Sequence, residues 1–204
     1  MKIICIGRNY VAHIQELNNE VPDEPVFFMK PDSSLLRNND PFFIPDWTSD
    51  VHHEVELVLR VSRLGKGIEK RFAHRYYDAI GLGIDFTARD VQNKLKAKGL
   101  PWEKAKAFDR AAVIGSEFLP VESFSDLKNI SFRLDINGNM VQNGNSGLMI
   151  YDFDTIISYV SSFVTLKIGD LIYTGTPVGV GPVHSGDVLA GYLEDKEMFR
   201  FRIK

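Results

Sequence analysis

Residues 53–59 read His53-Glu-Val-Glu-Leu-Val-Leu59, and residues 83–87 read Gly83-Ile-Asp-Phe-Thr87. Glu54 and Glu56 stand two apart in an otherwise apolar run, which is typical of a buried β-strand. Because a strand has a period of two, both carboxylates project from one face, and the intervening apolar side chains project from the other. Asp85 ends a second apolar run that also predicts a strand.

Three carboxylates delivered by strands would form an all-oxygen ligand set, which Mg²⁺, Mn²⁺ and Ca²⁺ prefer. Like charges side by side on a strand are destabilising unless a positive charge lies between them. The pattern therefore predicts a divalent metal site at Glu54, Glu56 and Asp85. The alternative that spacing leaves open is a solvated polar face with one aspartate at a strand end.

The composition is that of an ordinary globular protein. The chain has 204 residues, a formal net charge of −3 and no block of five or six like charges, so a nucleic-acid partner is not expected. No stretch approaches the roughly 18 apolar residues of a membrane span, and a cytoplasmic location is the default expectation. The one cysteine, Cys5, lies in an apolar run and is expected to be a buried small hydrophobe.

Short strands outnumber helices and do not alternate with them regularly, which indicates a β-rich α+β fold rather than a doubly wound sheet. No linker-like composition appears, so residues 1–204 are interpreted as a single catalytic domain. Asn137-Gly138 predicts a two-residue hairpin turn, and Asp152 or Asp154 can cap the helix that follows. Strands are expected at 2–6, 26–29, 54–61, 79–84, 133–136, 140–142, 171–173, 188–193 and 198–203, and helices at 10–17, near 73–78, at 88–98 and at 152–163.

His13 and Glu16 are spaced i, i+3 on the first short helix, so their side chains can meet on one face. A histidine oriented by a carboxylate is a common general base near neutral pH. The same spacing also occurs on exposed helices without function. Lys106 can hold a substrate carboxylate or be a surface residue, and the glycine-rich segment 174–182 can approach a small ligand or form a plain turn.

Taken together, these pieces resemble the fumarylacetoacetate hydrolase family, and the small acylpyruvase and oxaloacetate decarboxylase members in particular. The motifs arrive in order and cover almost the whole chain, which makes the resemblance more specific than any one of them. They are Ile6-Gly-Arg-Asn-Tyr10, His13-x-x-Glu16, Phe28-Met-Lys-Pro31, His53-Glu-Val-Glu56, Asp85-Phe-Thr-Ala-Arg-Asp-Val-Gln92, Gly99-Leu-Pro-Trp102, Ala105-Lys-Ala-Phe108, Leu134-Asp-Ile-Asn-Gly138, Ile157-Ser-Tyr-Val160 and Thr174-Gly-Thr-Pro177.

The resemblance implies a mixed β-sandwich roll, a homodimer and a Mg²⁺ cofactor, with Mn²⁺ or Ca²⁺ as alternatives. It implies roles for three groups of residues. The metal ligands would be Glu54, Glu56 and Asp85, the catalytic residues His13, Glu16 and Lys106, and the substrate-binding residues Arg8, Gln92 and Thr176. The eukaryotic fumarylacetoacetate hydrolases carry an extra N-terminal domain, and this chain begins almost at the catalytic region, so that specific activity is not expected.

A 2-oxo acid is a natural chelator of such an ion through its carboxylate and 2-keto oxygens. For an acylpyruvate, His13 would activate a water that attacks the 4-carbonyl, and the C3–C4 bond would break to release pyruvate. For oxaloacetate, the same binding would stabilise the enolate formed as CO₂ departs. The alternatives are an isomerase or tautomerase of 2-hydroxy-dienoate or 2-oxo dicarboxylic acids and, from another class, a non-catalytic metal- or carboxylate-binding module.

Overall fold

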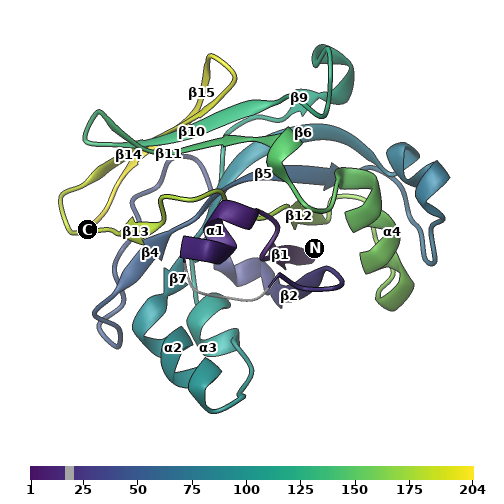
Figure 1. Cartoon of the computed structure of the whole chain (residues 1–204). Coiled ribbons are helices and arrows are strands. Elements are labelled where there is room, and N and C mark those ends of the chain that lie inside the picture. The colour runs from purple at the N-terminus through teal and green to yellow at the C-terminus, as the bar shows by residue number, and fades with distance from the viewer. Residues whose placement is uncertain (17–20) are drawn as a thin grey trace.

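The computed structural model describes residues 1–16 and 21–204, and its strands form three sheets (Figure 1). The large sheet is mixed, because β1 pairs in parallel with β12 and β3 with β8, whereas β5 and β6 pair antiparallel along their length. In spatial order its strands are β2 (Val26–Lys30), β1 (Ile3–Gly7), β12 (Leu171–Tyr173), β5 (Val55–Val61), β6 (Tyr77–Asp85), β8 (Ala112–Ile114) and β3 (Leu35–Leu36), with β9 (Leu119–Pro120) also on β6.

The second sheet curls over the first and closes the core between them (Figure 1). Phe132, Leu134 and Leu189 project from it into the same buried cluster as Leu57 and Leu82 of the large sheet. The fold is therefore the β-rich mixed roll that the sequence predicts. The strands of the second sheet are β11 (Asn139–Asn145), β10 (Ser131–Ile136), β14 (Val188–Leu193) and β15 (Lys196–Arg202), and those of a small third sheet are β13 (Gly181–Pro182), β4 (Val51–His53) and β7 (Thr87–Ala88).

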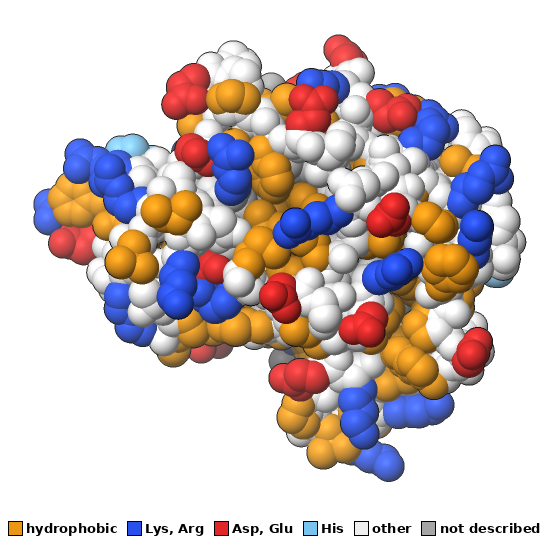
Figure 2. Space-filling view, turned by 180° about the vertical axis from the view of Figure 1, so that it is seen from behind, with side chains coloured by type: hydrophobic (Ala, Val, Ile, Leu, Met, Phe, Trp, Pro, Cys, Tyr) orange, Lys and Arg blue, Asp and Glu red, His pale blue; other side chains and the backbone are white. Residues whose placement is uncertain are grey.

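Four α-helices flank the sheets in the described part of the chain. In Figure 1, α1 (Val11–Glu16) crosses in front of the sheets, α2 (Arg89–Ala97) and α3 (Glu103–Lys106) lie below them, and α4 (Phe153–Phe163) covers one side. None of the described helices is long and apolar enough to cross a membrane. On the face seen from behind, Lys and Arg side chains are interspersed with Asp and Glu around hydrophobic patches (Figure 2).

Most predicted elements are confirmed, with bounds that differ by at most three residues. The Asn137-Gly138 turn has positive φ at both residues, 53° and 82°, and joins the paired residues Ile136 and Asn139. Positive φ at both central positions is what a type I′ turn requires. The end of the predicted first helix at Leu17 lies outside the described residues.

The predicted helix near Ala73–Asp78 is wrong. A 3₁₀ helix at Lys70–Arg75 occupies the first part, and β6 already begins at Tyr77. Pairing with β5 extends β6, because Val61 lies opposite Tyr77 and the Arg60 side chain forms an ion pair with Asp78 at 2.9 Å. Tertiary pairing thus overrides the local helical pattern.

The N-cap of α4 is Asp152, one of the two residues that the sequence allows. Its Oδ1 accepts hydrogen bonds from the backbone N–H of Thr155 at 2.8 Å and from the Thr155 hydroxyl at 2.5 Å. Asp154 instead accepts from the Tyr77 hydroxyl at 3.1 Å. The cap fixes the start of a helix whose Ile156, Ile157 and Val160 are fully buried.

We expect Asp152→Ala to lower the free energy of unfolding by about 0.5–2 kcal/mol, because the first-turn N–H loses its acceptor. Urea denaturation followed by far-UV circular dichroism measures the change. Asp152→Asn keeps an accepting oxygen at the same position and should retain most of the stability. Equal losses in the two variants would attribute the effect to the charge of Asp152 rather than to capping.

Candidate metal and substrate site

Antiparallel pairing of β5 with β6 brings the three predicted metal ligands together. Glu56 lies opposite Gly83 in this pair, and the backbone N–H of Asp85 donates to the carbonyl oxygen of Glu54 at 2.8 Å. One carboxylate oxygen from each of Glu54, Glu56 and Asp85 lies within 4.8 Å of the others. All three residues are at most 5% exposed, so this is a buried cluster and not a solvated face.

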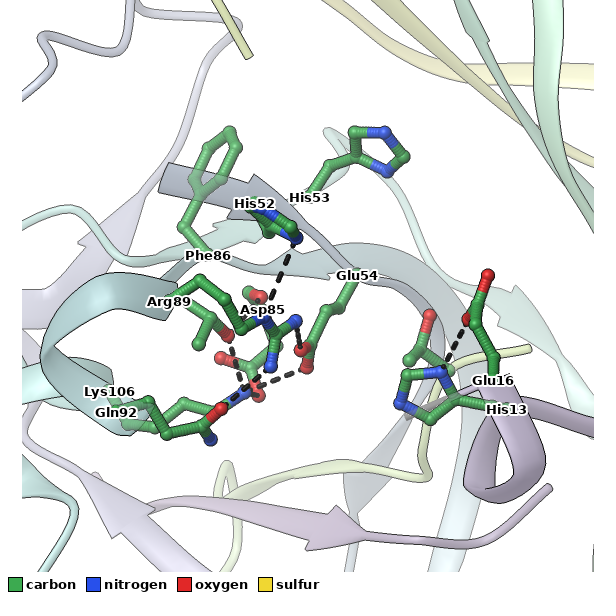
Figure 3. Close-up of polar contacts among 12 residues, drawn as sticks. His13, Glu16, His52, His53, Glu54, Asp85, Phe86, Arg89, Gln92 and Lys106 are labelled. Atoms are coloured by element: carbon green, nitrogen blue, oxygen red, sulfur yellow. Dashed lines mark hydrogen bonds and ion pairs between the residues drawn. The ribbon is translucent and has the colours of Figure 1, made fainter. Parts of the chain in front are cut away.

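Lys106 is buried against two of these carboxylates (Figure 3). Its Nζ donates to Oε2 of Glu54 at 2.7 Å, to Oδ2 of Asp85 at 2.7 Å and to the hydroxyl of Thr87 at 2.5 Å. An ammonium group has three N–H donors, and all three are therefore in use. The surface interpretation of Lys106 is excluded, and in this state its charge neutralises the acidic cluster.

Two further cations contribute to this compensation, and sequence reasoning gave neither of them a place in the site. Lys30 is 2% exposed, and its Nζ lies 2.5 Å from Oδ1 of Asp85 and donates to the carbonyl oxygen of Ala111 at 2.8 Å. Arg89 lies 2.5 Å from Oε1 of Glu54. The sequence did contain signals for both residues. Lys30 ends an apolar strand, and Arg89 lies one helical turn before Gln92.

Glu56 is the carboxylate without a cation. Among residues 1–16 and 21–204, no Lys, Arg or His forms an ion pair with it, and its Oε2 accepts a 2.7 Å hydrogen bond from the backbone N–H of Gly175. Burial, reinforced by the negative charges of Asp85 and Glu54, raises the pKa of Glu56 well above its usual value. A divalent cation bound between the three carboxylates would supply the missing positive charge, so the donor set fits such an ion.

Glu54, unlike Glu56, is held in its ionised form. Its burial opposes ionisation, but Lys106 and Arg89 outweigh that effect and hold the pKa of Glu54 well below its usual range. Glu54 is therefore an anion at neutral pH and a ready ligand for a cation.

Gly175 supplies the backbone N–H that donates to Glu56. Its φ of 102° lies in the region that favours glycine, and a Cβ at this position would come within 2.7 Å of Cβ of Asn9. Asn9 donates to the carbonyl oxygen of Thr174 at 2.8 Å and thereby fixes this loop. Of the two interpretations of the glycine-rich segment, close backbone approach at a site is the one that this geometry favours.

The predicted pair of His13 and Glu16 is formed and lies at the rim of the acidic cluster (Figure 3). Nδ1 of His13 is 3.1 Å from Oε2 of Glu16, and Oε1 of Glu16 accepts from the backbone N–H of Gly179 at 3.0 Å. His13 is 6% exposed. Burial lowers the pKa of His13 below its usual value even though Glu54 and Glu16 act in the opposite direction.

The remaining predicted residues, Arg8, Gln92 and Thr176, line the same cavity, whose volume is about 40 Å³. Oε1 of Gln92 accepts from Arg89 at 2.7 Å, so its amide N–H groups are what it can offer a ligand. The hydroxyl of Thr176 donates to the carbonyl oxygen of Val55 at 2.9 Å. The structure thus places eight of the nine predicted site residues on the wall of one cavity, and the ninth, Glu16, contacts the lining residue His13.

Gln142 is a buried contributor that sequence reasoning missed. Its Oε1 accepts from the backbone N–H of Val55 at 3.0 Å and lies 2.9 Å from Nδ1 of His53, and its Nε2 donates to the hydroxyl of Thr176 at 2.9 Å. It therefore ties the glycine-rich loop to Val55, the first residue of β5, which lies between Glu54 and Glu56. The residue lies 87 positions from Val55 in the sequence, and no local pattern reveals that contact.

Residues 2–204 match the family described as "Fumarylacetoacetate (FAA) hydrolase C-terminal". The chain belongs to this family. It is 46% identical over 189 residues to "Oxaloacetate decarboxylase, mitochondrial" of Dictyostelium discoideum, a match that covers 92% of this chain and 86% of that protein. It is 42% identical, with the same coverage of each chain, to "Oxaloacetate tautomerase YcgM" of Escherichia coli (strain K12).

A similar solved structure is that of fumarylpyruvate hydrolase from Pseudomonas aeruginosa in complex with Mn²⁺ and pyruvate. The TM-score is 0.93 at 32% sequence identity, and the match covers 100% of this chain and 89% of that one. A family member that holds Mn²⁺, together with the buried acidic cluster of this chain, indicates a divalent metal site at Glu54, Glu56 and Asp85.

We expect Glu56→Gln to abolish measurable Mn²⁺ binding in titration calorimetry, because the amide removes the one ligand charge that no lysine or arginine balances. Glu122→Gln, an exposed substitution outside the cavity, is the matched control and should bind as the wild type does. Wild-type affinity in Glu56→Gln would remove Glu56 from the ligand set.

Proposed function

We propose that this protein is a metal-dependent enzyme that acts on oxaloacetate, or a 2-oxo acid of similar size, by moving a proton at C3. Tautomerisation of oxaloacetate passes through the oxaloacetate enolate and decarboxylation through the pyruvate enolate, and both reactions place negative charge on the oxygen of C2. The observation that carries the proposal is the neutral, buried His13, held by Glu16 beside the acidic cluster. The names of the two relatives, an oxaloacetate decarboxylase and an oxaloacetate tautomerase, support the choice of substrate.

Glu54, Glu56 and Asp85 would hold the metal ion. When bound, a divalent cation supplies Lewis-acid stabilisation of negative charge on the carboxylate and 2-oxo oxygens of a substrate. Oxygen ligands suit Mg²⁺, and its cellular abundance favours it over Mn²⁺ and Ca²⁺ as the physiological ion.

His13 would act as the base. Its Nδ1 is engaged by Glu16, which leaves Nε2 as the nitrogen that exchanges a proton with the ligand. In tautomerisation, Nε2 takes a proton from C3 of the keto form, and the proton is returned to the oxygen on C2. In decarboxylation, the C3–C4 bond breaks as CO₂ leaves, the electron pair forms the pyruvate enolate, and a water molecule supplies the proton that adds to C3.

The other predicted residues would bind and orient the substrate. Gln92 offers its amide N–H groups, and Arg8 and Thr176 lie on the cavity wall. Lys106 would keep Glu54 and Asp85 charged and add positive charge near the substrate. The single catalytic domain over residues 1–204, the homodimer and the cytoplasmic location stay predictions.

Hydrolysis of acylpyruvates is the second candidate, and similarity to the fumarylpyruvate hydrolase structure favours it. In that reaction His13 would deprotonate a water, the resulting hydroxide would add to the 4-carbonyl, and the C3–C4 bond would break with protonation of C3. The products are pyruvate and a carboxylic acid. The same base serves both candidates, so substrate tests must separate them.

Parallel assays with Mg²⁺ and then with EDTA test the proposal. The decay of enol-oxaloacetate reports tautomerisation, and pyruvate release from oxaloacetate and from acetylpyruvate reports decarboxylation and hydrolysis. We expect metal-dependent turnover of oxaloacetate. Turnover of acetylpyruvate alone would establish the hydrolase instead, and turnover that EDTA leaves unchanged would contradict the metal-dependent mechanism.

We expect His13→Ala to lower kcat/KM for oxaloacetate tautomerisation by roughly 10²–10⁴-fold, because the general base is lost. Only the neutral imidazole accepts a proton, and its pKa is lowered, so wild-type kcat/KM should stay flat from neutral pH down past the ordinary histidine value of about 6.5 and fall below it. His184→Ala, which removes an exposed histidine, is the control. A loss smaller than tenfold, or an acid limb above about 6.5, would contradict the assignment.

A further inference from the structure

Two of the cations that line the cavity, Lys106 and Arg89, are bound to protein acceptors. Lys106 uses its three donors on Glu54, Asp85 and Thr87, and Arg89 is bound to Glu54 and Gln92. These groups neutralise the acidic cluster and keep its shape. A ligand must therefore find further positive charge elsewhere on the wall.

Lys96, in the last turn of α2, also lines the cavity but differs from Lys106 and Arg89 in its contacts. Among the residues that the structure describes, its ammonium group has no hydrogen bond and no ion pair, and its Nζ lies 5.5 Å from the centroid of the Trp102 ring. Burial, followed by the positive charges of Arg89 and Arg8, lowers the pKa of Lys96 to about 8. Burial and repulsion by neighbouring cations both disfavour the charged form of such a lysine, and an anionic ligand bound to it would favour the charged form.

An aromatic wall fixes the place of Lys96 relative to the acidic cluster. The rings of Phe28 and Trp102 are in edge contact with centroids 6.0 Å apart. Nζ of Lys106 lies 5.1 Å from the Phe28 centroid, and Lys96 lies over the neighbouring Trp102 ring. Lys106 is 3% exposed and Lys96 is only half-buried, so the two lysines mark the floor of the cavity and its opening.

We propose that Lys96 binds the second carboxylate of a 2-oxo dicarboxylic acid and thereby selects diacids over 2-oxo monocarboxylic acids. The 2-oxo carboxylate end would lie at the floor, beside Glu54 and Asp85, and the distal carboxylate would meet Lys96 at the opening. This inference rests on the proposed function, since it names the substrate class of the same site. The Trp102 ring lies 5.5 Å from Nζ of Lys96, and this cation–π contact helps to hold the ammonium group in place.

The test compares binding of two unreactive acids that differ by one carboxylate, malate and lactate, to the Mn²⁺-loaded protein by titration calorimetry. We expect the wild type to prefer malate. Lys96→Met keeps an apolar stem over Trp102 but removes the charge, and it should weaken malate binding by about 10–100-fold while lactate binding stays within about twofold. Lys96→Arg should keep the preference, as should Lys98→Met, which removes an exposed lysine two positions further along.

Two outcomes would overturn the inference. One is an unchanged preference for malate in Lys96→Met, and the other is a wild type that does not prefer malate to lactate. Turnover of oxaloacetate by the wild type is scored separately and decides the proposed function. A lost preference in Lys96→Met together with no turnover of oxaloacetate would keep Lys96 as a carboxylate-binding residue and reject the reaction.

Discussion

Three carboxylates within 4.8 Å of one another, buried under the sheets, are the constraint on which the rest of this structure depends. Removing an ion from water costs several kcal/mol, and like charges at this separation add to that cost. Cations from distant segments of the chain offset this cost. Lys30 comes from β2, Arg89 from α2 and Lys106 from α3, so the neutralisation of the site also fixes how these elements pack on β5 and β6.

The positive charges are distributed unevenly over the three carboxylates. Glu54 and Asp85 each have cations in contact, whereas Glu56 has a backbone N–H and the raised pKa that follows from burial beside two anions. The raised pKa favours a protonated Glu56 when no cation is bound, and a divalent cation would take the place of that proton. Glu56, the one carboxylate of the three without a cation, therefore indicates where a divalent cation would bind.

Much of this site could be predicted from the sequence, because strand periodicity places Glu54 and Glu56 on one face and the i, i+3 rule pairs His13 with Glu16. The hairpin at Asn137-Gly138 follows from turn chemistry in the same way. These are local rules, and they hold where the local pattern and the tertiary structure agree. The predicted helix near 73–78 failed because pairing of β6 with β5 reaches into that segment.

The contacts that could not be predicted join residues far apart in the chain. Lys30 reaches Asp85 across 55 positions, and nothing beside Lys30 in the sequence reveals its partner. Gln142 likewise ties β5 to the glycine-rich loop. At the floor of the cavity, cations of the protein itself balance Glu54 and Asp85. At its opening, Lys96 over Trp102 is left for a ligand to balance. A site built this way separates the groups that keep it folded from the group that can choose its substrate.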